Sequence, residues 1–450
     1  MAWINRYYFF KKNKLQATFR RWFASCYKAI TSIYKFGDFL IFLTNHAFSH
    51  IIMSRILFTV IIFTFFAQLT QAQGVRKYSN EFLSVGIGAR ALGMGNVQSA
   101  FSNDVTAAYW NPAGLQQLNN TQVGLMHAEW FAGIAKYDYV GIALPIADRR
   151  RSIGISAIRF AVDDIPNTLF LIDPDGSINY DNVTSFSAAD YAFLLTYAQK
   201  MGKFRVGANA KVIHRIVGKF ANSWGMGVDL GIQYQNKNFS MGLSLKDFPV
   251  TYNTWGFNFT EDEKEILDLT NNVIPINSVE LTGGRGILGF AYNLPLGKKA
   301  ALLASADFDI TTDGRRNTLI KTDFASIDPH VGMEFNYNQI VFLRAGINNI
   351  QQVTDDEGKK YTALQPNAGL GFKIRDAKTH RIPEIGIDYA FTGLNNLGSE
   401  NKLYSHVFSL TVSLNNKKNA PMPISEAEPK PEKKVKAKTR KDKTPQEQPQ

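Results

Sequence analysis

Cysteine and long apolar runs are what this sequence most clearly lacks. Its single cysteine, Cys26, lies ahead of the expected processing site described below, so the processed chain would have no thiol for a disulfide or a metal. A mean hydropathy of −0.16 excludes a bundle of membrane helices, because each such helix needs about twenty apolar residues. Glycine, with 34 residues, and aromatic residues, at 13%, are frequent instead, which suits many short strands and turns.

A strong charge of one sign is also absent from the main part of the chain. The formal net charge of +12 lies at the ends, with +7 in residues 1–52, one positive charge from Arg55 and +5 in residues 415–450, which leaves about −1 for residues 73–414. Such a body has no electrostatic reason to bind phosphate backbones. We therefore expect no nucleic-acid partner.

Residues 53–72 have the layout of a secretory signal peptide. A short basic start precedes an apolar run at 56–67, and the small residue Ala72 stands before Gln73. The run is shorter than the roughly twenty residues that a transmembrane helix needs. We expect cleavage between Ala72 and Gln73, with an uncleaved anchor as the alternative.

The two ends of the chain differ in composition from its middle. Residues 1–52 are rich in aromatic and basic residues, and a signal peptide at 53–72 does not require a segment before it. Either translation starts at Met53 or residues 1–52 form an extended leader. Residues 415–450 are rich in proline and lysine, which predicts disorder. This tail would lie in the periplasm, as a solvated spacer or in contact with peptidoglycan, anionic headgroups or a partner protein.

Strict alternation of apolar and polar residues dominates beyond residue 120. In residues 226–234, for example, apolar side chains alternate with glycine, aspartate and glutamine, and a tight hairpin is expected at 236–238. Each such segment is about ten residues long, enough to cross a bilayer at a tilt of about 45°. The fourteen candidate strands, an even number as in bacterial barrels, are 123–130, 136–145, 151–162, 189–200, 203–216, 224–236, 238–247, 286–294, 300–311, 329–337, 340–348, 367–375, 383–392 and 403–414.

The pattern favours a transmembrane antiparallel β-barrel in the cell outer membrane over a soluble β-sandwich. The polar face carries glycine, serine, asparagine and aspartate, as a wet lumen does, and closure satisfies every backbone amide in lipid. Longer gaps at 163–188, 248–285, 312–328 and 349–366 are expected to be extracellular loops, with a helix at 261–269. Tyrosines at strand ends are expected to form interface girdles: Tyr197, Tyr234, Tyr337, Tyr389 and Tyr404.

The most distinctive stretch lies between the signal peptide and the first strand. It contains Phe82-Leu83, the sequence Gly-Ala-Arg-Ala-Leu-Gly-Met-Gly at 88–95 and Tyr-Trp-Asn-Pro-Ala-Gly-Leu at 109–115. These motifs resemble the start of the PorV/PorQ family of outer-membrane proteins, relatives of the FadL-type fatty-acid channels. The resemblance implies that residues 73–120 form a hatch inside a barrel made by residues 121–414.

The hatch contains the candidate site residues, and each has a physical reason. Glycines allow close backbone packing in a crowded lumen, a proline fixes a turn, and an asparagine before it can cap its own backbone. Arg90 is expected to pair with a lumen carboxylate such as Asp104, the alternative being that it faces water. The candidates are Arg90, Gly93, Gly95, Asp104, Trp110, Asn111 and Pro112.

Other motifs point less clearly to chemistry. Residues 86–91 match a dinucleotide fingerprint but lack its strand-helix-strand context. Residues 173–181 hint at a calcium loop, although Pro-Asp-Gly is first a turn signal. The seven histidines are scattered, and the four on expected strands, His127, His214, His330 and His406, each stand alone. No Gly-x-Ser-x-Gly elbow occurs. We expect no catalytic residues, no metal and no cofactor.

Two functions remain open. The family resemblance implies a barrel that binds or shuttles cargo C-terminal domains or translocon components in type IX protein secretion. The alternative is a FadL-like channel for small hydrophobic molecules such as fatty acids, in which movement of the hatch releases the ligand. Both functions are non-enzymatic, and both place the barrel in outer-membrane lipid.

Overall fold

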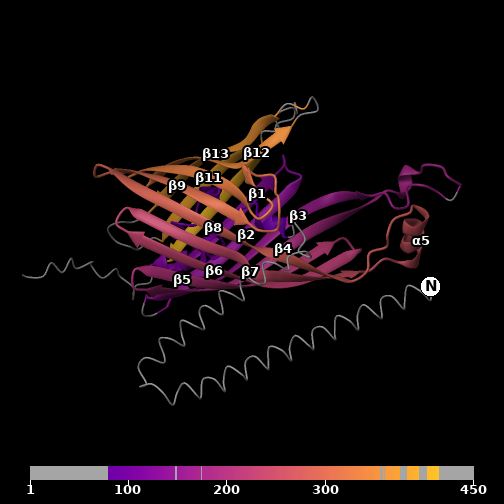
Figure 1. Ribbon diagram of the computed structural model, residues 1–450, viewed down its shortest axis with the longest axis horizontal. Helices are drawn as coiled ribbons and strands as arrows, with labels where there is room; N and C mark the ends of the chain where they lie inside the picture. The colour runs from indigo at the N-terminus through magenta and orange to yellow at the C-terminus, as the bar shows by residue number, and fades with distance from the viewer. Residues whose placement is uncertain are drawn as a thin grey trace, which may run out of the picture. The chain divides into compact units, whose positions relative to one another are not determined.

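The fold is a single antiparallel sheet that closes on itself (Figure 1). The computed structural model describes residues 80–146, 149–173, 175–354, 358, 360–375, 383–394 and 403–414. The fourteen long strands are β1 (Thr121–Trp130), β2 (Ala135–Pro145), β3 (Arg151–Asn167), β4 (Thr184–Met201), β5 (Phe204–Val217), β6 (Ala221–Asn236), β7 (Phe239–Phe257), β8 (Ser278–Leu296), β9 (Ala300–Thr311), β11 (Ser326–Tyr337), β12 (Val341–Thr354), β13 (Lys360–Ile374), β14 (Glu384–Leu394) and β15 (Leu403–Leu414). The two-residue β10 (Ile320–Lys321) pairs only with β11.

Closure depends on two pairings between strands that are not consecutive. Strand β1 pairs with β15, and β9 pairs with β11. Every long strand therefore has two hydrogen-bonded neighbours, so the sheet has no open edge. The predicted fourteen-strand antiparallel barrel is confirmed.

The alternation in the sequence places opposite environments on the two faces of the sheet. On β6, Met226 and Val228 are exposed on the outer face, whereas Asp229 and Gln233 are buried in the lumen. An outer face of exposed aliphatic and aromatic side chains suits lipid, and closure satisfies the backbone there. The protein is an outer-membrane β-barrel. None of the helices in the described segments is long and apolar enough to cross a membrane.

The two ends of the barrel differ in the length of their connections. At one end the strands are joined by short connections, such as residues 202–203 and 237–238, where Gly202 and Lys237 have positive φ values. At the other end three connections between long strands are much longer, at residues 168–183, 258–277 and 312–325, although those after β1 and β5 are short. Outer-membrane barrels place short turns in the periplasm and long loops outside the cell, which assigns the two ends.

The predicted extracellular loops are shorter than expected because strands extend into them. Strand β3 continues to Asn167, and β7 continues to Phe257, so paired strands project beyond the membrane zone. The predicted helix is present as α5 (Glu261–Leu269), with a reciprocal capping box between Thr260 and Glu263.

The hatch occupies the lumen as a chain of short helical turns. These are η1 (Glu81–Leu83), α3 (Ala89–Leu92), α4 (Ala107–Trp110) and η2 (Pro112–Gln117). Asn80 bonds to Thr282 near the extracellular end, and Gln116 bonds to the carbonyl of Arg149 at the periplasmic end. The predicted signal peptide, the Ala72–Gln73 cleavage site, residues 1–52 and 73–79 and the tail 415–450 lie outside the described residues.

Candidate functional site

The barrel wall has glycine at many of the positions where the hatch lies against it. A methyl group added at Gly346 would come within 2.1 Å of the carbonyl carbon of Met94, and one at Gly242 within 2.0 Å of the Ser99 carbonyl oxygen. At most wall glycines that face the hatch, a side chain would overlap hatch backbone, so glycine is what allows the hatch to pack directly on the wall. The wall glycines that face the hatch are Gly207, Gly231, Gly242, Gly289, Gly332, Gly346 and Gly369.

Two predicted hatch glycines meet this wall. The Cβ of any larger residue at Gly93 would lie 2.9 Å from the Cα of Gly369. Gly95 has a φ of +69°, and a Cβ there would lie 2.8 Å from the amide nitrogen of Ile347. Backbone therefore packs on backbone along this side of the lumen.

Arg90 is the centre of a buried ionic network. Its Nε and Nη2 atoms each lie 2.9 Å from an oxygen of Glu334 on β11. Arg344 on β12 binds the same carboxylate at 2.7 Å and reaches Asp388 on β14 at 2.6 Å. The predicted partner Asp104 lies 3.9 Å from Arg90, so the main partner is Glu334, and Asp104 is at the edge of the network.

The Asn-Pro turn joins the hatch to the opposite wall. The Asn111 amide donates to the carbonyl of Ser99 at 2.8 Å and to that of Ile232 at 3.1 Å, while its oxygen accepts from the Ala113 amide. Pro112 packs against Gly231. The buried Trp110 donates from Nε1 to the carbonyl of Ile87 at 2.9 Å, which holds the two halves of the hatch together.

A second ionic cluster was not predicted. Lys211 on β5 lies 2.8 Å from Asp229 and 2.7 Å from Asp247, and all three are buried. The neighbouring Lys246 donates to the backbone carbonyl of Tyr109 in the hatch. The signal in the sequence was that Lys211, Asp229 and Lys246 fall on the glycine-containing face of adjacent strands, which is the lumen face. Asp247 breaks the alternation and reaches the lumen through the bulge between Lys246 and Val250.

Little space remains between the hatch and the wall. A cavity of about 20 Å³ is lined by Tyr109, Trp110, Lys246, Arg285 and His330 among others, room for roughly one water molecule. A solute larger than water does not fit in this cavity with the hatch in this position.

An aromatic cluster lies at the extracellular end of the lumen. Phe186 of β4 packs edge-on against Phe220 at 5.3 Å, and Phe220 stacks on Phe259 at 5.9 Å. Phe257 lies between Phe259 and Trp255, at 6.4 and 6.2 Å. We call these five rings the mouth cluster. All five are only partly buried.

A column of apolar wall residues continues below the mouth cluster on strands β3 to β5. These side chains belong to the same buried core as Phe82, Leu83 and Ile87 of the hatch. The column residues are Ile158, Ala192, Leu194 and Ile213. The lumen thus has an apolar column on β3–β5, although β5 also contributes Lys211 and Arg215 to ion pairs with Asp229 and Asp190. The ion pairs that hold Arg90 lie on β11–β14.

The other candidates from the sequence lie apart from the lumen site. Asp173 accepts hydrogen bonds from the amides of Asn179 and Asn182, which close a turn in the β3–β4 connection. Across the part of the chain that the structure describes, no group of three or more His, Cys, Asp or Glu residues could hold a metal. The four strand histidines contact separate partners: His127 with Asp138, His214 with Trp224, His330 with Asp328 and His406 with Tyr389.

Comparison with known proteins found matches among solved structures. The CymD monoaromatic hydrocarbon channel has a TM-score of 0.45 at 14% identity, over 74% of this chain and 98% of that one. The Ralstonia pickettii toluene transporter TbuX has a TM-score of 0.45 at 12% identity, over 73% of this chain and 99% of that one. A Pseudomonas aeruginosa FadL homologue has a TM-score of 0.43 at 12% identity, over 73% of this chain and 98% of that one. No family model and no curated protein matches the chain.

Proposed function

We propose that the protein is an entry channel for small hydrophobic molecules, held closed by its hatch. The mouth cluster carries this proposal, because five partly buried rings at the outer opening of a lumen form a surface onto which an apolar solute can partition from water. The apolar column at β3–β5 continues that surface inward.

Passage would require the hatch to shift, because hatch backbone packs directly on the glycines of the wall and the cavity beside Tyr109 holds roughly one water molecule. The ligand would first bind among the rings of the mouth cluster. Movement of hatch segment 82–87 away from the column would then join the mouth to the lumen below. Other contacts would keep the rest of the hatch in place, since Arg90 and Lys246 are held by buried charged and backbone partners.

Ligand binding to the purified barrel tests this proposal. Phe257→Ser should weaken the binding of a fluorescent long-chain fatty acid or of toluene about tenfold or more, since burying an aromatic ring contributes roughly 1.5–3 kcal/mol. Tyr252→Ser is the matched control, because Tyr252 lies on the same strand and faces outward. Equal binding by the wild type and both variants, or no binding by the wild type, would contradict the proposal.

A second candidate function is recognition of secreted protein cargo or of translocon components in type IX secretion. The observation that favours it is the pair of projecting β3–β4 and β7–β8 connections, which carry exposed apolar side chains that a partner protein could cover. These residues are Phe170, Ile172, Ile178, Tyr180, Leu269, Val273 and Ile276.

One purification separates the two functions. The processed protein is isolated from outer membranes in mild detergent, and proteins and lipids in the same eluate are identified by mass spectrometry. Near-stoichiometric secretion proteins, lost when Ile172 and Ile178 are changed to serine, would support cargo recognition. A lone barrel with a defined hydrophobic ligand, lost in Phe257→Ser, would support the channel.

A further inference from the structure

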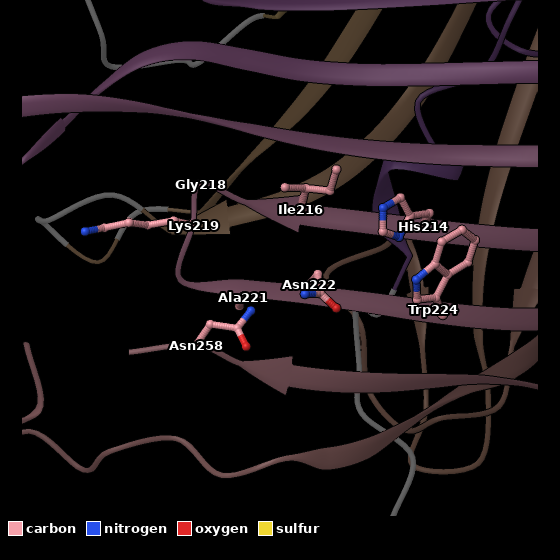
Figure 2. Close-up of a pocket in the computed structure, with 8 residues that line it drawn as sticks. All are labelled: His214, Ile216, Gly218, Lys219, Ala221, Asn222, Trp224 and Asn258. Atoms are coloured by element: carbon pink, nitrogen blue, oxygen red, sulfur yellow. The ribbon is translucent and has the colours of Figure 1, made fainter. Parts of the chain in front are cut away.

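A groove of about 420 Å³ lies on the outer face of the barrel, where β5 and β6 approach their extracellular turn. Figure 2 shows its lining, with the side chains of His214 and Trp224 side by side at one end and Lys219 at the other. The alternating neighbours Ile213 and Ser223 are buried, so His214, Ile216, Asn222 and Trp224 face away from the lumen. The lining is His214, Ile216, Lys219, Asn222, Trp224 and Asn258, with Gly218 and Ala221.

The height of this groove corresponds to the headgroup layer. Phe204 and Tyr234, whose rings lie 5.2 Å apart, form an aromatic pair at the periplasmic end of the same two strands. His214 is ten positions above Phe204 on β5, about 33 Å along the strand. At a strand tilt of about 40° this is roughly 25 Å across the membrane, the height of the apolar band of such barrels.

The groove is built around a stack of aromatic rings in direct cross-strand register. Tyr191 pairs with His214, and His214 with Trp224. The ring of His214 lies 4.0 Å from that of Trp224 and 6.4 Å from that of Tyr191, with near-parallel planes. The His214 Nδ1 atom lies 3.0 Å from the Ser223 carbonyl, which holds the imidazole in place. Trp224 is still 57% exposed.

Two of the polar groups of the groove are uncharged side-chain amides. Asn222 and Asn258 have no side-chain hydrogen bond to another described residue, and Figure 2 shows both amides between Lys219 and Trp224. Lys219 is already paired with Glu263 of α5 at 2.8 Å, so its charge is compensated. A phosphate therefore finds no free cation here, whereas hydroxyl groups find amide donors and acceptors.

We propose that this groove binds a sugar ring in the headgroup of an outer-leaflet glycolipid. The exposed face of Trp224 would stack against the apolar face of the ring, and Asn222 and Asn258 would bond to its hydroxyl groups. The acyl chains would lie below, along the outer face of β5 and β6, where Val212, Met226 and Val228 are exposed to lipid.

The test compares lipids retained by the barrel after reconstitution of the full processed chain. Nanodiscs contain phospholipid with or without a lipopolysaccharide-type glycolipid, and native mass spectrometry counts the lipids that stay bound. We expect one retained glycolipid in the wild type, and at least a fivefold lower occupancy in Trp224→Leu and in Asn222→Leu. Tyr404→Leu is the matched control, because Tyr404 is an exposed outward aromatic on β15, away from the groove.

The lipids retained by the groove variants and by the control decide whether the groove binds glycolipid. Selective loss of glycolipid in the two groove variants supports the site. Retention of phospholipid to the same extent as glycolipid, equal glycolipid loss in Tyr404→Leu, or no retained glycolipid in the wild type would overturn it. An unheated gel, on which a folded barrel migrates differently from an unfolded one, verifies that each variant is folded.

Discussion

The contact between Arg90 and Glu334 should control how often the hatch opens. Glu334→Gln keeps the shape of the side chain and removes the charge that both Arg90 and Arg344 contact. Loss of one partner of a buried ion pair costs about 3–5 kcal/mol. We expect about 3 kcal/mol, at the low end, because Asp388 still pairs with Arg344 and 22% of the Arg90 side chain is exposed.

Residues 27–450 contain no cysteine, so a cysteine introduced into the hatch makes this opening measurable. A cysteine placed at Ala91, which is 2% exposed in the hatch, reacts with a soluble thiol reagent only when the hatch moves. If opening limits labelling, 3 kcal/mol corresponds to a rate increase of about 100-fold.

Two controls define the result that would refute this argument. Glu261→Gln removes an exposed ion pair with Lys264 on α5 and should leave the labelling rate within about twofold, since such pairs contribute roughly 0–1 kcal/mol. If Glu334→Gln folds, as judged on an unheated gel, and labels at the wild-type rate, the Arg90 contact does not hold the hatch.

Two further changes probe the wall and the extracellular helix. Gly346→Ala should raise the labelling rate at least tenfold and lower the thermal midpoint, because the new methyl group meets Met94 backbone at 2.1 Å; Gly386→Ala, with 3.7 Å of clearance, should change little. Burial would raise the pKa of Glu263, but hydrogen bonds from Lys219 and Thr260 outweigh it and hold the pKa below its usual 4.5. The stabilisation of the α5 connection by ionised Glu263 is therefore present above pH 4.5 and is lost as the pH falls through the lowered pKa. Proteolysis of this connection should increase in acid for the wild type and vary less in Glu263→Gln.

The strands were predictable where alternation is unbroken, and three predicted ends coincide with bulges. Strand β3 was expected to end at residue 162, β7 at 247 and β12 at 348, and the register shifts lie between Val162 and Ile165, Lys246 and Val250, and Asn348 and Gln351. An extra residue moves the following side chains to the opposite face. The alternation therefore stops in the sequence although pairing continues in the structure.

The partners of the hatch were harder to predict than the hatch itself. Its glycines and the Asn-Pro turn are local features, visible in a short stretch of sequence. The contact of Arg90 with Glu334 joins residues 244 positions apart, and it depends on the path of the hatch across the lumen. Only the nearby Asp104 could be proposed from the sequence, and the structure places it at 3.9 Å.

The unequal anchoring of the hatch bears on where a solute could pass. On the β7–β14 side the anchors carry charge, such as Arg90 with Glu334 and the carboxylate of Asp307 with the amides of Gln98 and Ser99. On the β2 side they are neutral, such as the Tyr137 hydroxyl with the carbonyl of Phe82. A neutral hydrogen bond contributes about 1 kcal/mol, less than a buried ion pair costs to break. The hatch segment at Phe82 should therefore be the first to detach from the barrel wall, because its contact with Tyr137 is neutral.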